Sequence, residues 1–488
     1  MSDKPFSHQE IFKRLNAIPR PSHHEKAVAD FLCDFAKELH LEHERDKENC
    51  VVIRKPASKG CEKAPTVVLL NHMDMVAVGD GSRPFDPLRD GIQAYEQDGW
   101  LKALGTSLGA DNGVGLSMAL AVLADDDMSH PALEVLTTTN EEDGMSGAEH
   151  LGADFIKGRR VINLDSEDYD TITVGAAGAL IQSALFAPKW EEIKDDCRFY
   201  RISILGGQGG HSGVDIHKGR CNAIKELAKA LEELSEDIKS GDCHVTEISG
   251  GFASAAIPAS CSVTIALRKD GNCKAEKISD VVKRLTSRLD STYARTDPGV
   301  HVLWEEAPKG SRFLSCALDV LSAIGHLPSG VLSMREDLPG VVMTSNNIGL
   351  IQTEEDGVSL SLHTRSFSDQ IMEETARQLS KTLLGHHAQK VSLLMNTPAW
   401  QEKADSEYLR FVESTFKDVL GFTPRRVAMH FVLEAGYYVQ KYPGIEIACI
   451  GPRILEPHST SERVEISTID NIWEVLKELL IRLSKKTA

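Results

Sequence analysis

The chain has 488 residues and a formal net charge of −18 at pH 7, with 41% hydrophobic and 26% charged residues. This composition is that of a globular protein, and the length allows two to four domains of about 100–200 residues each. The negative charge argues against nucleic acid and anionic membranes as partners. The ten cysteines include no C-x-x-C pair, the N-terminus is polar, and no long apolar run is present, so a cytoplasmic protein with reduced thiols and no spanning helix is expected.

The first third of the chain predicts alternating helices and strands. A helix is expected over residues 8–17, and a second one follows the break at residues 19–22, with Ser22 as its N-cap. Such alternation predicts an α/β layer structure whose mixed sheet is largely parallel. Short apolar runs mark strands over residues 66–70, 133–139 and 161–164, and a helix is expected over 113–123.

The middle of the chain has a different pattern, which predicts an inserted α+β domain. The last strand and helix, from residue 445 onward, return to the α/β pattern. We therefore expect a discontinuous catalytic domain, formed by residues 1–180 and 396–488, that is interrupted by a lid or dimerisation domain over 181–395. Glycine-rich stretches at 175–178 and 206–210 are candidate hinges. In the insert, strands are predicted over 200–205, 261–267 and 358–363, and helices over 222–238, 275–293 and 369–384.

Residues that bind metals follow four of the strand candidates, and one more begins a helix. In open α/β sheets, side chains beyond the carboxyl ends of the strands share one cleft. Two histidines and three carboxylates suit two metal ions that share a bridging carboxylate. Alone, Asp111 would more often be a helix cap, His72 a satisfied histidine at a strand end, and the pair Glu141-Glu142 part of a solvated loop. Their recurrence at the strand ends favours a metal site. The residues are His72, Asp111, Glu142, Asp165 and His458.

These motifs resemble those of the aminoacylase/carboxypeptidase clan of co-catalytic zinc peptidases. Within that clan they are similar to those of the bacterial aminoacyl-histidine dipeptidases, also called cytosolic non-specific dipeptidases. The likeness runs in order through nearly the whole chain, so the set is specific although each motif is short. Its pieces are Ile18-Pro19-Arg20-Pro21-Ser22, His72-Met73-Asp74-Met75-Val76, Gly109-Ala110-Asp111-Asn112-Gly113, Glu141-Glu142, Asp165-Ser166-Glu167 and Pro457-His458-Ser459.

The resemblance implies a pair of zinc ions, each with its own ligands and with Asp111 as the bridge. His72 and Asp165 would complete the ligands of one ion, and Glu142 and His458 those of the other. Manganese or cobalt in place of zinc is compatible with the same side chains.

The resemblance also implies the reaction, which is hydrolysis of dipeptides, Xaa-His among them, by a water that bridges the two ions. Glu141 would be the general base that activates this water. Asp74 would orient His72. A small peptide as substrate and a homodimer formed through the insert are further implications.

In the insert, the resemblance points to side chains that would contact the substrate. His211, in a Gly-rich segment, would stabilise the tetrahedral intermediate, and Asn347 would contact the substrate. Arg365 would hold the free carboxylate of the peptide. Where the family has His-Ala-Gly-Leu-Glu, this chain has His430-Phe431-Val432-Leu433-Glu434. The larger residues reshape the pocket at the amino end of the substrate, where Glu434 is the candidate amine anchor.

Other interpretations stay open at this point. The same metals would also suit an N-acyl amino acid deacylase or a tripeptidase. Gly105-Thr106-Ser107-Leu108-Gly109 fits the nucleophile elbow of serine hydrolases, although no clear strand is predicted directly before Ser107. A non-catalytic binding protein on the same scaffold is a further alternative. His24-Glu25-Lys26-Ala27-Val28 fails as the helix motif of single-zinc proteases, because Val28 stands where a second histidine is needed.

Overall fold

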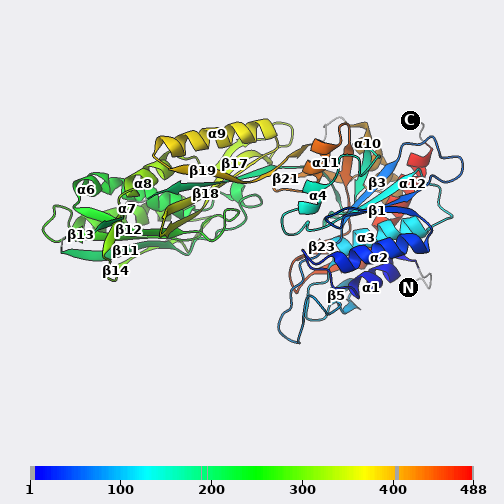
Figure 1. Cartoon of the computed structure of the whole chain (residues 1–488), viewed down its shortest axis with the longest axis horizontal. Coiled ribbons are helices and arrows are strands. Elements are labelled where there is room, and N and C mark those ends of the chain that lie inside the picture. The colour runs from blue at the N-terminus through cyan, green and yellow to red at the C-terminus, as the bar shows by residue number, and fades with distance from the viewer. Residues whose placement is uncertain (1–5, 188–189, 195, 402–405, 486–488) are drawn as a thin grey trace. The chain divides into compact units, whose positions relative to one another are not determined.

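The computed structural model describes residues 6–187, 190–194, 196–401 and 406–485 and divides into two compact units (Figure 1). Unit 1 comprises Met1–Gly175, Trp400–Ala428 and Glu434–Ala488. Unit 2 comprises Ala176–Ala399 and Met429–Leu433. The sequence predicted a discontinuous domain of segments 1–180 and 396–488 with an insert over 181–395. These domain bounds stay a proposal, which the division into two units supports. The two glycine-rich hinges stay a prediction.

Unit 1 is built on a mixed sheet in the strand order β1-β2-β6-β3-β7-β22-β8-β20, with β21 beside β8. At its centre β6, β3, β7 and β22 run parallel, and β1 and β2 are antiparallel at one side. The predicted α/β fold with a largely parallel sheet is confirmed. The strands are β1 (Glu42–Arg45), β2 (Val51–Lys55), β3 (Val67–His72), β6 (Leu133–Thr138), β7 (Arg160–Asn163), β8 (Thr171–Ala176), β20 (Trp400–Gln401), β21 (Arg425–Met429) and β22 (Glu446–Cys449).

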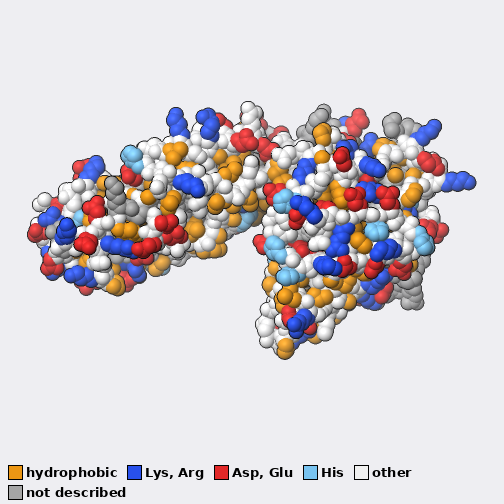
Figure 2. Space-filling model, in the orientation of Figure 1, with side chains coloured by type: hydrophobic (Ala, Val, Ile, Leu, Met, Phe, Trp, Pro, Cys, Tyr) orange, Lys and Arg blue, Asp and Glu red, His pale blue; other side chains and the backbone are white. Residues whose placement is uncertain are grey.

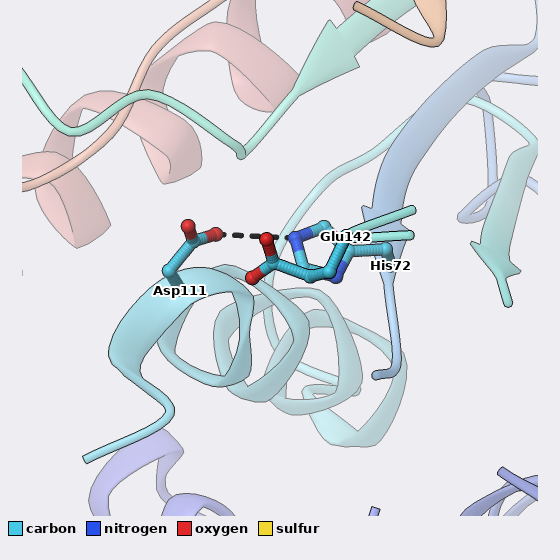
Figure 3. A group of neighbouring side chains, drawn as sticks. All are labelled: His72, Asp111 and Glu142. Atoms are coloured by element: carbon cyan, nitrogen blue, oxygen red, sulfur yellow. Dashed lines mark hydrogen bonds and ion pairs between the residues drawn. The ribbon is translucent and has the colours of Figure 1, made fainter. Parts of the chain in front are cut away.

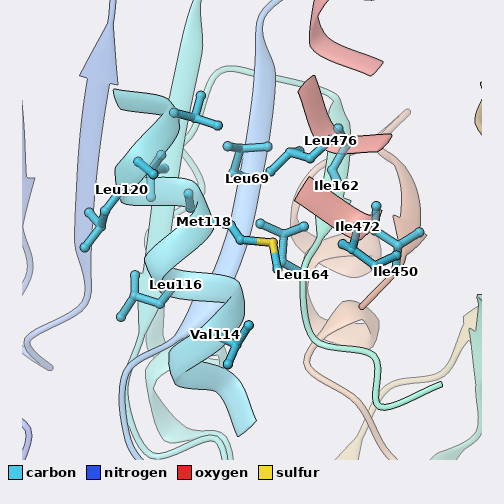
Figure 4. Close-up of a cluster of buried hydrophobic side chains, with 14 of the residues drawn as sticks. Leu69, Val114, Leu116, Met118, Leu120, Ile162, Leu164, Ile450, Ile472 and Leu476 are labelled. Carbon is cyan, nitrogen blue, oxygen red and sulfur yellow. The ribbon is translucent and has the colours of Figure 1, made fainter. Parts of the chain in front are cut away.

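Helices cover this sheet, and their apolar side chains form the core of unit 1. Leu69 of the sheet, Met118 of α3 and Leu476 of α12 belong to one buried cluster (Figure 4). Burial of such side chains is the main source of stability. The helices are α1 (His8–Asn16), α2 (Lys26–Glu38), α3 (Ala110–Ala124), α4 (Ser146–His150), α10 (Glu407–Leu420), α11 (Ala435–Lys441) and α12 (Ile466–Ser484). A smaller sheet contains β4 (Ala94–Gln97), β5 (Trp100–Ala103), β23 (Ile454–Leu455) and β24 (Arg463–Glu465).

Unit 2 contains an antiparallel sheet in the order β14-β11-β13-β12-β17-β18-β9-β19, with β16 beside β17. The predicted inserted α+β fold is confirmed. Its strands are β9 (Gly178–Phe186), β10 (Trp190–Glu192), β11 (Cys197–Leu205), β12 (Cys243–Gly250), β13 (Cys261–Arg268), β14 (His301–Glu306), β15 (Arg312–Leu314), β16 (Gly330–Met334), β17 (Val342–Glu354), β18 (Gly357–Ser366) and β19 (Lys390–Thr397). Its helices are η1 (Ile216–Lys218), α5 (Ala223–Leu231), η2 (Glu232–Leu234), α6 (Ser235–Ser240), α7 (Ala275–Tyr293), α8 (Ala317–His326) and α9 (Asp369–Gly385).

Two predicted helices differ from the structure. Ser22 does not cap α2, which begins at Lys26 after Glu25; its hydroxyl instead donates to Asp74 Oδ2 at 2.8 Å. The helix expected over 222–238 is interrupted by η2 between α5 and α6. A tertiary partner explains the first difference, because a serine hydroxyl can bond a distant carboxylate as readily as a helix N–H.

On the face drawn in Figure 2, Lys and Arg side chains are interspersed with Asp and Glu side chains over each unit. Among the helices described, none is both long and apolar enough to cross a membrane.

Candidate metal centre and substrate-binding residues

The parallel strands of unit 1 end at one edge of the sheet, and the predicted metal ligands follow those ends. His72 is the last residue of β3, Glu142 follows β6, and Asp165 follows β7. Asp111 lies in the first turn of α3. Figure 3 shows Asp111, His72 and Glu142 beside one another, and single ligand atoms of these three lie within 4.8 Å of each other. The sheet therefore gathers side chains that are far apart in the sequence.

Asp111 lies between two histidines, with a different carboxylate oxygen facing each. Its Oδ1 is 3.1 Å from His72 Nε2, and its Oδ2 is 3.2 Å from His458 Nε2. Each histidine also faces a second carboxylate: His72 Nε2 is 3.3 Å from Asp165, and His458 Nε2 is 2.8 Å from Glu142. The five side chains thus form two adjacent groups of candidate ligands that share Asp111. His458 lies beyond β23, so it follows β22 less directly than the sequence suggested.

Asp74 is fully buried and accepts hydrogen bonds from the loop that carries Glu141 and Glu142. Its Oδ1 lies 3.5 Å from His72 Nδ1 and accepts the backbone N–H of Glu141 at 3.1 Å. Its Oδ2 accepts the backbone N–H of Glu142 at 3.2 Å and the hydroxyl of Ser22. One carboxylate therefore fixes the loop that carries both glutamates and lies beside the ring of His72, which it is expected to orient.

Burial and crowding of like charges shift the pKa values of the carboxyl groups. Burial raises the pKa of Asp165 to about 6, against the attraction of His72. Burial also raises the pKa of Glu141 well above its usual value; His72 opposes this shift, and Asp165 adds to it. For His72, burial alone would lower the pKa, but Asp165 and Asp111 outweigh it and raise the pKa well above the usual value. Two imidazoles do not balance this many buried carboxylates.

The donor set fits divalent cations. Imidazole nitrogens and carboxylate oxygens are the usual protein ligands of zinc, and one carboxylate with an oxygen for each site suits a pair of ions. Among the described residues, the buried Oε1 of Glu142 has no hydrogen-bond partner. A buried acceptor without a partner costs free energy, and a cation would remove this cost together with the repulsion between the carboxylates.

Glu434, the candidate amine anchor, is also brought into unit 1 at this edge of the sheet. Its Oε2 accepts hydrogen bonds from the hydroxyls of Thr138, at 2.8 Å, and Tyr438, at 3.1 Å. Its Oε1 is buried and has no partner among the described residues. Burial raises the pKa of Glu434 to about 8, although His72 pulls it down. The carboxyl group is thus held in place on one side, with one oxygen left for a further partner.

Arg365 is a buried cation on the sheet of unit 2. It lies on β18 opposite Ser345 of β17, is 2% exposed, and forms no ion pair with any carboxylate in the described part of the chain. Its guanidinium makes long contacts of 3.4 and 3.5 Å with the hydroxyl of Ser212. Burial lowers the pKa of Arg365 to about 10, so it remains charged at pH 7. A buried, unpaired guanidinium is a strong anion site.

His211 adjoins this arginine, with its Nε2 at 3.4 Å from Arg365 Nη2. The backbone N–H groups of Gly213 and Val214 both donate to His211 Nδ1, at 3.3 and 3.1 Å. Burial and the charge of Arg365 lower the pKa of His211 to about 4, so the ring is neutral at pH 7. With Nδ1 accepting, we assign the proton to Nε2. Two donors, one charged and one neutral, therefore lie side by side.

Asn347 is already bonded within unit 2. Its amide group donates to the carbonyl oxygens of Ser254 and Ala256 at 2.9 and 2.7 Å, and its Oδ1 faces the Asn222 side chain at 3.4 Å. The adjacent Asn346 likewise donates to Pro328. The direct contact between Asn347 and substrate stays a prediction; in this structure Asn347 holds the loop that precedes β13.

Three residues of the site were missed as functional residues in the sequence. Ser22 bonds Asp74, Glu25 accepts the backbone N–H of Asn140 at 2.9 Å, and Glu462 accepts N–H groups of the loop that leads to Asp111. Ser22 ends one recognised motif and Glu462 stands a few residues after another, but nothing in their local pattern distinguishes them from a helix cap or a solvated side chain.

Ser107 has the surroundings of a structural residue. Its hydroxyl donates to the carbonyl of Val76 at 2.7 Å and accepts the N–H of Val78 at 3.1 Å, and the side chain is fully buried. A strand, β5, ends at Ala103, before the segment of Ser107 but not directly before Ser107. However, β5 pairs antiparallel with its neighbours, which is unlike the parallel strand of a nucleophile elbow.

The chain is similar to known peptidases. The model of the M20 peptidase dimerisation domain matches residues 202–297. The cytosol non-specific dipeptidase of Escherichia coli is 33% identical over 480 residues, which is 98% of this chain and 97% of that protein. The crystal structure of aminoacylhistidine dipeptidase from Vibrio alginolyticus has a TM-score of 0.87 at 32% identity and covers 97% of this chain and 96% of its own. A tripeptidase from Staphylococcus aureus shares the fold alone, with a TM-score of 0.52 at 15% identity.

A relative of this identity over nearly the full length of both chains establishes the family. The chain belongs to the M20 family of metallopeptidases. The candidate metal ligands lie in unit 1 of this peptidase, and the dimerisation-domain match lies in unit 2.

Proposed function

We propose that this M20 dipeptidase hydrolyses dipeptides, Xaa-His among them, at a pair of zinc ions held by His72, Asp111, Glu142, Asp165 and His458. The observation that carries the proposal is the position of Asp111, whose two oxygens face two different histidines. The names of the Escherichia coli and Vibrio alginolyticus relatives support dipeptides as substrates. The bound ions would act as Lewis acids on the scissile carbonyl and lower the pKa of the attacking water.

Glu141 is the proposed general base. It follows β6, its backbone is fixed by Asp74 Oδ1, and it lies among the carboxylates of the ligand cluster without being needed as a ligand in either set. Its carboxylate would take a proton from the attacking water and return it to the leaving amine. The same side chain can carry out both proton transfers if it faces the reacting atoms and does not bind the metal.

The ends of the substrate provide the specificity for dipeptides. Arg365, charged and unpaired in unit 2, would bind the free carboxylate, and Glu434, with one free oxygen, would bind the amine. A deacylase substrate has no free amine, whereas a tripeptide places its two charges one residue farther apart. The tripeptidase of Staphylococcus aureus shares only the fold, which therefore does not separate the alternatives.

A panel of substrates tests this proposal. Dipeptides should be hydrolysed, whereas their C-terminal amides should react poorly because the charge of Arg365 would be buried without its partner. Truncating one member of a buried charge pair costs about 2–5 kcal/mol, so kcat/KM should fall roughly 30-fold or more. Arg365→Met should cause a similar loss for the dipeptide and little further loss for the amide.

The matched control is Arg377→Met, which removes an exposed guanidinium from α9. Equal efficiency for a dipeptide and its amide would remove Arg365 from the site. Preference for an N-acetyl amino acid over every dipeptide would replace the dipeptidase with a deacylase.

His211 is proposed to stabilise the oxyanion of the tetrahedral intermediate. Its neutral ring keeps a proton on Nε2, which adjoins Arg365, the proposed carboxylate site. Removing one oxyanion donor costs roughly 10²–10³-fold in kcat in other acyl-transfer enzymes. His211→Ala should therefore lower kcat by about this factor, with metal content and KM little changed. His217→Ala, an exposed histidine of the same segment, is the control.

The source of His211 is tested in mixed protein. If the histidine acts across a dimer, combining His211→Ala with Glu141→Gln chains should restore some activity after subunit exchange. Failure of rescue after confirmed exchange would assign His211 to its own chain. Near-normal kcat in His211→Ala would remove it from the chemistry.

A homodimer formed through unit 2 is proposed on the match of residues 202–297 to the peptidase dimerisation domain. A cytosolic location is supported by the name of the Escherichia coli relative. Manganese and cobalt remain alternatives to zinc, since both accept the same nitrogen and oxygen ligands.

A further inference from the structure

Glu462 is a buried carboxylate that accepts four consecutive backbone N–H groups. Its Oε2 accepts those of Leu108, at 2.7 Å, and Gly109, at 2.9 Å. Its Oε1 accepts those of Ala110, at 2.8 Å, and Asp111, at 3.3 Å. Glu462 is 3% exposed and lies more than 350 residues later in the chain than this loop. The first N–H groups of a helix have no partner within the helix, and a carboxylate is favourable there.

Arg20 holds the same loop through its carbonyl side. Its Nη2 donates to the carbonyl of Gly109 at 2.7 Å, and its Nη1 donates to the carbonyls of Met73 and Asp74, both at 3.1 Å. Gly109 has a φ of 66°, and a Cβ at this position would lie 2.6 Å from Arg20 Nη2. The positive φ favours glycine at this position, and a larger residue would also have to displace the Arg20 guanidinium. Arg20 therefore joins the loop to the residues that follow β3, and Glu462 joins it to the segment that carries His458.

The loop needs such support because it carries the shared ligand. Asp111 and Asn112 have non-helical backbone angles inside α3, with ψ values of 113° and 29°. The regular helix ladder therefore does not fix the position of the Asp111 carboxylate. Glu462 stands four residues after His458, whose Nε2 faces Asp111 Oδ2 at 3.2 Å. The segment that bonds the loop before Asp111 through Glu462 is thus the same segment that carries the candidate ligand His458.

We propose that Glu462 is a positioning residue that sets the spacing between Asp111 and His458 and so determines how tightly the metal ions bind. The proposal rests on the two-metal function proposed above. Glu462 would contact neither substrate nor metal. The plainer alternative is a helix cap that contributes to stability alone, and the two differ in what happens to metal affinity.

The test is Glu462→Gln. A glutamine keeps the size of the side chain but places an NH₂ group against two backbone N–H donors, so half of the contacts become repulsive. Removing a residue that orients metal ligands typically lowers metal affinity 10- to 100-fold. We expect the dissociation constant for Zn²⁺, measured by competition with a chromophoric chelator, to rise by about this factor. Far-UV circular dichroism of the metal-free variant should remain that of the wild type.

The matched control is Glu134→Gln. Glu134 is also buried in unit 1, and its Oε2 accepts the N–H groups of Lys157 and Gly158, both at 2.8 Å. These residues contain no proposed ligand. Both variants should lose stability, but only Glu462→Gln should lose metal affinity. Equal Zn²⁺ affinity in Glu462→Gln and the wild type would overturn the proposal.

A second measurement separates this proposal from the two-metal function itself. Hydrogen exchange of the amides of residues 108–111 is followed in the metal-free wild type and in Glu462→Gln. Loss of protection at these four amides, in excess of that in Glu134→Gln, shows that Glu462 holds the loop before Asp111 even if the wild type binds no Zn²⁺. In that case the two-metal function fails on its own. Unchanged protection would overturn the positioning role, whatever the metal does.

Discussion

Dialysis against a strong chelator should abolish dipeptide hydrolysis, and added zinc or manganese should restore it. The physical reason is the ligand cluster, in which Asp111, Glu142 and Asp165 crowd around two histidines. Without cations, the site has no Lewis acid to polarise the substrate. The negative charges of the carboxylates also remain uncompensated. Hydrolysis rates and metal content, measured by mass spectrometry on the same samples, check the prediction.

The stoichiometry makes this test sharper. Restored activity should track two ions per chain, because Asp111 offers one oxygen to each histidine. Saturation of activity at one ion per chain would reduce the proposal to a single metal. Full activity in protein that is verified to be free of metal would contradict the proposed chemistry altogether.

Glu141→Gln should nearly eliminate turnover while leaving the metal content unchanged. Glutamine has the size and shape of glutamate but cannot accept the proton of the attacking water. General acid–base groups typically increase the rate about 10²–10⁴-fold, and kcat should decrease by a factor in this range. The backbone N–H of residue 141 would still bond Asp74, so the loop should keep its place.

Glu142→Gln is the matched comparison, since it changes the neighbouring side chain in the same way. Glu142 Oε2 lies 2.8 Å from His458, and its loss as a ligand should reduce the metal content of the protein. If Glu141→Gln loses metal while Glu142→Gln retains it, the roles of the two glutamates are exchanged.

Much of the fold follows from local patterns in the sequence. The apolar runs of β3, β6 and β7 are buried on both sides, as central parallel strands are, and the amphipathic period of α7 matches its structure over Ala275–Tyr293. Competition between local and tertiary hydrogen-bond partners was harder to predict. Ser22 serves Asp74 instead of capping α2, and the helix expected over 222–238 is divided by η2.

The side chains of unit 2 show how much depends on tertiary contacts. The local sequence around Arg365 does not show whether its side chain is buried; in the structure it is buried without a carboxylate partner among the residues described. Asn347 resembled a substrate contact, but its amide is bonded to the carbonyls of Ser254 and Ala256. Burial and pairing depend on which strands become neighbours, which local patterns do not contain.

The sequence by itself determined the kinds of candidate ligand and their order along the chain. Histidine or carboxylate after successive buried strands, and aspartate at a helix start, are local features that single segments carry. The tertiary structure decided which oxygen of Asp111 faces which histidine, and it brought Glu462 to the loop before Asp111. The reason is physical: ligand geometry and buried hydrogen bonds depend on distances of a few ångströms between segments hundreds of residues apart, and only the packed sheet and its helices fix those distances.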